Sequence, residues 1–142
     1  MSNYRQLRSD VIDIKYSEES FWNYLNSRFS SIVPSLCEYL EVDSGAKTSS
    51  GEPLVQVLEL YRNPLGIDFS VHVYFEIDGD VRYISGKYMI AAINKKLIVK
   101  DFESKFYVTL DTRESGIDFW KQAFEEMCKD MISRLKDMSP KI

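Results

Sequence analysis

Residues 115–138 read SGIDFWKQAFEEMCKDMISRLKDM, and the apolar side chains of this segment recur at steps of three and four. That spacing predicts one apolar face of a long α-helix, which either packs as core or lines a cavity. Ser115 and Asp118 resemble a capping box at its start. Lys136 suits its C-terminal end, and Pro140 prevents it from continuing. The apolar face consists of Ile117, Trp120, Phe124, Met127, Met131, Leu135 and Met138, widened by Phe119, Ala123, Cys128 and Ile132.

The composition is that of one globular domain over residues 1–142, with 44% hydrophobic and 28% charged residues. A net charge of −4 and a pI of about 5.1 argue against nucleic acid as a partner, because phosphate binding needs a basic surface. No apolar run approaches the roughly 20 residues that cross a bilayer, and the N-terminal residues lack the apolar core of a signal peptide. We therefore predict a cytoplasmic protein that does not bind membranes.

The two cysteines, Cys37 and Cys128, both fall on predicted helices and lie far apart in the sequence. The chain has no Cys/His pattern with the spacing of metal ligands. We predict no metal site and no cofactor. Two buried thiols in a reducing compartment are the favoured interpretation, with a disulfide as the alternative.

The N-terminal third predicts one strand followed by two short helices. Residues 11–16, VIDIKY, alternate between apolar and polar side chains as a strand does. Ser17 is then the predicted N-cap of a helix that Pro34 ends or kinks, and a second helix follows over residues 35–42. Residues 43–53, DSGAKTSSGEP, predict a flexible loop.

The middle of the chain alternates with period two and predicts antiparallel strands joined by tight turns, with Gly86 as a candidate bulge. With residues 11–16 counted, the sheet has five to six strands in a meander. The fold class is therefore α+β, an antiparallel meander followed by the long C-terminal helix. The predicted strands cover residues 54–62, 67–77, 81–92, 97–102 and 106–110.

One face of the strand at residues 67–77 is polar and invites a catalytic interpretation. Ser70 and His72 are neighbours on this face, with Asp68 beside them, as a serine hydrolase would require. A nucleophile normally lies on a turn, and a solvated sheet face explains the same alternation. Acidic residues around Asp78 and Asp80 suit a hard cation, but turn chemistry explains them better. We predict no catalytic residues, and a binding role is favoured over an enzymatic one.

The order of elements resembles the START-like helix-grip superfamily, which includes Bet v 1-type proteins and activators of a heat-shock-protein ATPase. The resemblance rests on Ile12-Asp13-Ile14, then Ser17, Glu18 and Glu19, then Phe21-Trp22-Asn23-Tyr24-Leu25, and on a last helix that opens with Phe119-Trp120 and closes with Leu135-Lys136. It implies a curved sheet around the last helix, with a cavity between them that holds an apolar small molecule.

The resemblance also implies which side chains line that cavity. The helix would contribute one wall and the sheet the other, and the alternative is that these side chains meet and fill the space. A different class of function, a stoichiometric inhibitor such as a toxin-neutralising immunity protein, is also open, because an acidic surface steers a protein to a basic partner. The expected ligand-binding residues are Trp120, Phe124, Met127, Met131, Phe69, Val71, Val73, Phe75, Tyr83 and Tyr88.

Overall fold

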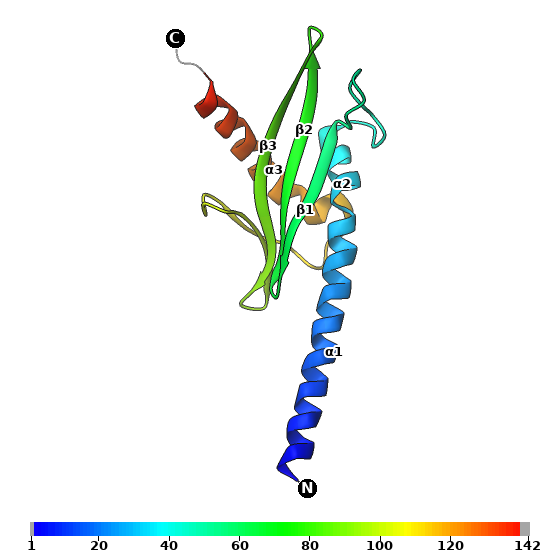
Figure 1. Cartoon of the computed structure of the whole chain (residues 1–142), viewed down its shortest axis with the longest axis vertical. Coiled ribbons are helices and arrows are strands. Elements are labelled where there is room, and N and C mark those ends of the chain that lie inside the picture. Colours follow the sequence, from blue (N-terminus) through cyan, green and yellow to red (C-terminus); the bar gives the residue numbers. More distant parts are fainter. Residues whose placement is uncertain (1, 140–142) are drawn as a thin grey trace. The chain divides into compact units, whose positions relative to one another are not determined.

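Figure 1 shows the computed structural model of the chain, in which residues 2–139 are described. The chain divides into two compact units, the first ending at Ser31 and the second beginning at Ile32. The first unit is a single helix, α1 (Asn3–Ser30). The Ser2 hydroxyl caps its N-terminus by accepting a hydrogen bond from the Arg5 N–H at 3.2 Å.

The strand predicted at residues 11–16 is wrong, because these residues lie inside α1, as does Ser17, the predicted N-cap. The short alternation of apolar and polar side chains in this segment is compatible with two periods. Over a longer window, Tyr4, Leu7, Val11 and Ile14 follow the helical steps of three and four. A window of six residues was too short to distinguish the two periods.

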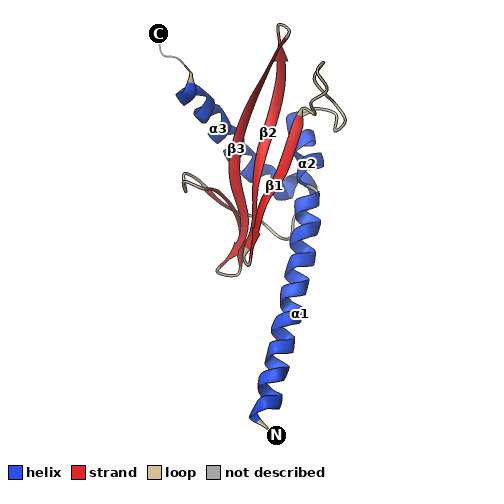
Figure 2. Cartoon of the chain, in the orientation of Figure 1, coloured by secondary structure: helices blue, strands red, loops and turns tan. Residues whose placement is uncertain are grey.

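A helix break near Pro34 is confirmed. A new helix, α2 (Ile32–Leu40), begins directly after Ser31, and Pro34 lies in its first turn. Proline is tolerated there because a first-turn N–H has no partner within the helix. Figure 2 shows that the strands follow this helix and that one further helix closes the fold.

The second unit contains the predicted antiparallel meander, with five strands in the order β1-β2-β3-β4-β5. The helices α2 and α3 pack against each other, and α2 contacts β1 while α3 contacts β3. Both lie behind the strands in the view of Figure 1. The remaining elements are β1 (Val55–Asn63), β2 (Gly66–Ile77), β3 (Asp80–Ile93), β4 (Lys96–Asp101), β5 (Tyr107–Thr109) and α3 (Gly116–Met138).

Two of the hairpins close through turns whose central residues are both left-handed. Asp78 and Gly79 have φ angles of 51° and 82°, and Asn94 and Lys95 have φ angles of 51° and 63°. This geometry matches the right-handed twist of the flanking strands. The turns predicted at these two places are therefore confirmed.

The predicted capping box at the start of α3 does not form. Ser115 is the N-cap residue, but its side chain accepts no capping hydrogen bond. The apolar face is nevertheless buried from Phe119 to Met131, whereas Leu135 and Met138 are 44% and 82% exposed. The predicted stop at Pro140 lies outside the described residues.

The predicted bulge at Gly86 is also wrong, because Gly86 pairs with Val71 in an unbroken register between β2 and β3. The irregularity lies instead in β1, between Glu59 and Tyr61. Gly86 serves a different purpose. The phenol of Tyr88 lies directly where a β-carbon on residue 86 would be, so only glycine leaves room for it.

We expect Gly86→Ala to destabilise the fold by about 1–3 kcal/mol, because the added methyl group displaces the buried Tyr88 ring. Gly45→Ala is the matched control, since a β-carbon at residue 45 meets no atom within 4 Å. Urea denaturation of both variants measures the effect. Equal stability of the two variants would contradict the assigned role of Gly86.

Candidate functional site

The residues predicted to line a cavity are not brought together around one space. Phe75 and Tyr83 are 43% and 54% exposed, and they lie on opposite faces of the sheet. The other eight are at most 5% exposed and belong to the core between α3 and the sheet. These eight are Trp120, Phe124, Met127, Met131, Phe69, Val71, Val73 and Tyr88.

The core between α3 and the sheet is filled by ring contacts. The rings of Trp120 and Phe124 stack with centroids 5.7 Å apart, and Phe124 meets Tyr39 of α2 at the same distance. Phe69 lies 6.1 Å from Tyr88. A side chain with 0% exposure, such as Trp120 or Tyr88, faces no space large enough for water. A ligand between α3 and the sheet therefore stays a prediction that needs this core to open.

A buried polar connection crosses this core, and no pattern in the sequence predicted it. The Tyr88 hydroxyl donates to Asp130 Oδ2 at 2.7 Å and approaches the carbonyl of Met127 at 3.2 Å. The Nε of Arg134 donates to the same carboxylate oxygen at 2.9 Å. Burial and the bond to Asp130 raise the pKa of Tyr88, and the Asp130 carboxylate raises the pKa of Arg134.

The same arginine reaches the segment between β4 and β5. Its Nη1 lies 3.2 Å from Glu103 Oε1, and its Nη2 lies 3.8 Å from Oδ2 of the fully buried Asp101. The other oxygen of Asp101 accepts the N–H of Phe106 at 3.1 Å. Arg134 thus connects α3 to β3 through Asp130 and Tyr88, and to the β4–β5 connection through two carboxylates.

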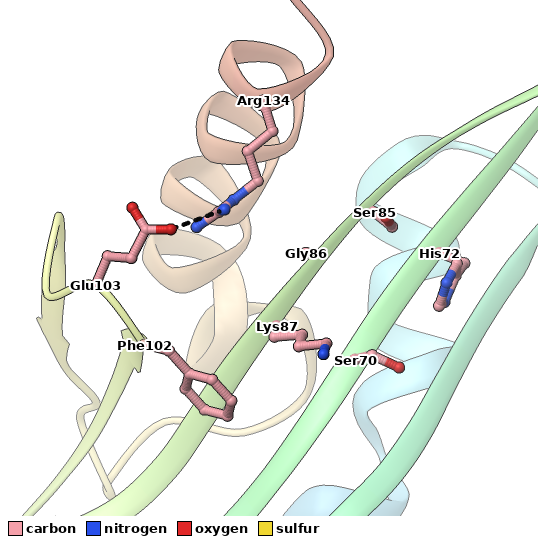
Figure 3. A pocket seen from close by; sticks show the side chains of 8 residues that line it. All are labelled: Ser70, His72, Ser85, Gly86, Lys87, Phe102, Glu103 and Arg134. Carbon is pink, nitrogen blue, oxygen red and sulfur yellow. Dashed lines mark hydrogen bonds and ion pairs between the residues drawn. The ribbon is translucent and has the colours of Figure 1, made fainter. Parts of the chain in front are cut away.

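A polar pocket of about 380 Å³ lies beside this arginine, where the edge of β3 is not paired with β4, and Figure 3 shows the side chains that line it. Ser70 pairs across the sheet with Lys87, and His72 pairs with Ser85, so these four side chains lie on one face. Phe102, which directly follows β4, also lines this pocket (Figure 3). The polar pocket is lined by Ser70, His72, Ser85, Gly86, Lys87, Phe102, Glu103 and Arg134.

The polar pocket brings Ser70 and His72 together without the geometry of a catalytic triad. Within residues 2–139, no hydrogen bond joins Ser70 to His72, and the buried Nδ1 of His72 has no hydrogen-bond partner. Oδ1 of Asp68 is likewise buried and unpaired, and burial raises the pKa of this carboxyl group. A triad requires both the Ser–His and the His–Asp hydrogen bonds. The ring of His72 instead lies 5.8 Å from that of Tyr83.

The described part of the chain contains no cluster of side chains that could bind a metal ion. No three His, Cys, Asp or Glu side chains between residues 2 and 139 gather as metal ligands. Cys37 and Cys128 are both free thiols, and burial raises the pKa of each. None of the helices over residues 2–139 combines the length and the apolar character needed to cross a membrane.

A second pocket, which we call the loop pocket, lies between the end of α2, the loop at residues 43–53 and the adjoining ends of β1 and β2. It also has a volume of about 380 Å³, but apolar side chains dominate its wall. Two of the predicted ligand-binding residues, Val73 and Phe75, belong to it. The loop pocket is lined by Leu40, Val42, Lys47, Thr48, Leu54, Val55, Val73, Tyr74, Phe75 and Glu76.

The loop at residues 43–53 is held in place over this pocket by hydrogen bonds. Thr48 and Glu52 bond through backbone and side chain, with the Thr48 N–H donating to the Glu52 carbonyl at 2.8 Å. The N–H of Ser49 donates to Glu76 Oε2 at 3.2 Å, and its hydroxyl donates to the other oxygen. Glu76 therefore fastens the loop to the end of β2. The sequence showed the loop, but it did not indicate this partner 27 residues away.

Comparison of the chain with protein-family models, with curated proteins and with solved structures finds no match. The resemblance to the helix-grip superfamily therefore stays a prediction.

We expect Tyr88→Phe to lower the free energy of unfolding by about 1–3 kcal/mol at neutral pH, because it leaves buried Asp130 with one donor fewer. Tyr83→Phe, at a half-exposed ring outside this network, is the control and should change stability little. Urea denaturation measures both. A larger loss of stability in Tyr83→Phe than in Tyr88→Phe would contradict the stabilising role of the hydrogen bond between Tyr88 and Asp130.

We also expect the stability of the parent protein and that of Tyr88→Phe to depend differently on pH. The folded state holds the pKa of Tyr88 above its ordinary value of 10.0, so above that pH the unfolded chain loses this proton and the folded chain retains it. The stability of the parent protein should therefore fall as pH rises past 10.0, with about 1.4 kcal/mol per pH unit from this group. Tyr88→Phe should lack this contribution. If the stability of the two proteins fell equally steeply with pH, the folded state would not raise the pKa of Tyr88.

Proposed function

We propose that this protein is a non-enzymatic binding domain for an apolar small molecule, and that the molecule binds in the loop pocket. The observation that carries the proposal is the contrast between two regions. The core between α3 and the sheet is filled by side chains such as Trp120 and Phe124, which are 0% exposed. The loop pocket is an open hollow with a mainly apolar wall.

The size and the chemistry of the loop pocket suit such a ligand. Small-molecule sites commonly have volumes of about 300–1,000 Å³ and combine apolar walls with a few polar groups. Leu54, Val73 and Phe75 supply apolar surface, and burial of a ligand against it contributes about 25 cal/mol per Å². The ligand would therefore be small, since about 380 Å³ is near the lower end of that range.

The polar groups at the rim indicate how the ligand would be oriented. The Glu76 carboxylate already accepts a hydrogen bond from Ser49, and the Thr48 hydroxyl already donates one to Glu52. Lys47 lies at the rim of the pocket and forms no ion pair within residues 2–139. An apolar molecule that ends in a carboxylate or another acceptor would place its body against the wall and its polar end at Lys47.

We expect Leu54→Trp to weaken binding at least tenfold, because the larger side chain of a half-buried wall residue occupies the pocket. Leu58→Trp is the matched control, since Leu58 is a 51% exposed leucine of β1 outside the pocket. The probe is anilinonaphthalene sulfonate, an apolar fluorophore with one anionic end, and titration by fluorescence gives its affinity for each variant.

Native mass spectrometry of the protein purified from its own cells tests the natural ligand. We expect a small apolar molecule that is lost on denaturation and absent from Leu54→Trp. Equal probe affinity in Leu54→Trp and Leu58→Trp would contradict the proposal. A stoichiometric basic protein in place of a small molecule would replace it with the inhibitor hypothesis.

A further inference from the structure

The N-terminal half of α1 carries a stripe of large apolar side chains in solvent. Tyr4, Leu7, Val11 and Ile14 are 74%, 64%, 62% and 57% exposed. They are spaced at three, four and three residues, which is the repeat of positions a, d, a and d in a coiled coil. We call these four side chains the seam.

An unpartnered seam of this kind is unusual on a soluble helix. Helices of globular proteins normally bury their apolar stripe, and most of their stability comes from that packing rather than from intrinsic propensity. The seam occupies the first half of a 28-residue helix, and each of its members is more than half exposed. A contiguous apolar stripe in solvent marks an interaction surface.

We propose that α1 pairs with α1 of a second copy of this chain, in parallel and in register, as a short two-stranded coiled coil through the seam. Val11 occupies an a position and Leu7 occupies a d position. A β-branched residue at a with leucine at d is the combination that favours two strands in a parallel arrangement, and the outer positions of the seam carry Tyr4 at a and Ile14 at d. The proposal is independent of the ligand proposed for the loop pocket.

The charges beside the seam support a second copy and set its direction. With Val11 at position a, Asp10 falls at position g and Lys15 at the following e position. In a parallel pair, position g of one helix faces the next e position of the other, so Asp10 meets Lys15 of the second copy on both sides. In an antiparallel pair the e positions face each other, which would bring together the cations Arg8 and Lys15.

The contacts that these two side chains make within α1 leave them able to pair across the seam. Lys15 lies 3.9 Å from Glu19, and both side chains are more than half exposed. Asp10 accepts one exposed hydrogen bond from Gln6 at 3.1 Å. Such exposed contacts contribute little, so exchanging them for an interhelical pair costs little.

The overall charge of α1 favours a protein partner over a membrane surface. Surface-binding helices are typically rich in lysine and arginine, which attract anionic lipids. In α1 four basic residues are balanced by four acidic ones, so its net charge is zero. They are Arg5, Arg8, Lys15 and Arg28 against Asp10, Asp13, Glu18 and Glu19.

The seam is short, so the dimer should dissociate on dilution. The next a position after Val11 is Glu18, and two facing carboxylates end the apolar contact there. Two heptads of seam bury far less surface than a long zipper. We therefore expect a reversible equilibrium between monomer and dimer that depends on concentration.

Sedimentation equilibrium of the full chain, over a range of protein concentrations, tests the pairing. We expect the parent to form dimers as its concentration rises, and Val11→Asp to weaken the dimer at least tenfold. Ser9→Asp adds the same charge at the outward f position and should leave the dimer unchanged. Val11 and Ser9 are both exposed, so circular dichroism should show that both variants stay folded.

Two further variants test direction and register. Ile14→Cys should form a disulfide between copies under oxidised glutathione, because identical d positions face each other in a parallel pair. The parent, which retains Cys37 and Cys128, controls for other thiols. Asp10→Lys should weaken the dimer, and addition of Lys15→Asp should restore it.

Three results would overturn the proposal. The first is a parent chain that stays monomeric at all concentrations. The second is a dimer that Val11→Asp leaves intact. The third is a monomer that instead binds vesicles of anionic phospholipid through α1, with loss of binding in Val11→Asp.

Discussion

The second unit depends on how α3 is held against the sheet. Apolar contacts of Trp120, Phe124 and their neighbours supply most of the buried surface, but such contacts are not directional. The hydrogen bond from Tyr88 to Asp130, made over the bare backbone of Gly86, fixes the position of the helix along β3. Arg134 extends this connection to Glu103, so that helix, strand and the β4–β5 connection are joined by one set of polar contacts.

This packing determines where the protein has pockets that could hold a ligand. Because side chains fill the interior, hollows lie at the margins of the sheet. They include the polar pocket near Arg134, the loop pocket beside residues 43–53, and a hollow of about 290 Å³ lined by Tyr83 of β3 and Met131 of α3. The loop pocket depends on the bond between Ser49 and Glu76, which holds the loop at the end of β2. The loop pocket adjoins the core through Val55 and Val73, whereas Trp120 and Phe124 of α3 do not line it.

The sequence predicted what periodicity encodes and missed what depends on long-range contacts. The meander and α3 were predictable because alternation and steps of three and four persist over many residues there. Residues 11–16 were misassigned because six residues fit both periods. Asp130 could not be identified as a buried acid, since its partners Tyr88 and Arg134 are recognisable only once β3 and α3 are paired. For the same reason, Phe75 and Tyr83 were placed in one cavity although they lie on opposite faces.

NMR distinguishes an apolar molecule bound in the loop pocket from one bound in the core between α3 and the sheet. Backbone and methyl shifts are recorded during titration with anilinonaphthalene sulfonate. We expect the largest changes on Val42, Leu54 and Val73, which line the loop pocket. Changes centred on Trp120 and Met127, with the loop pocket unaffected, would contradict this expectation and show that the core opens to hold the ligand.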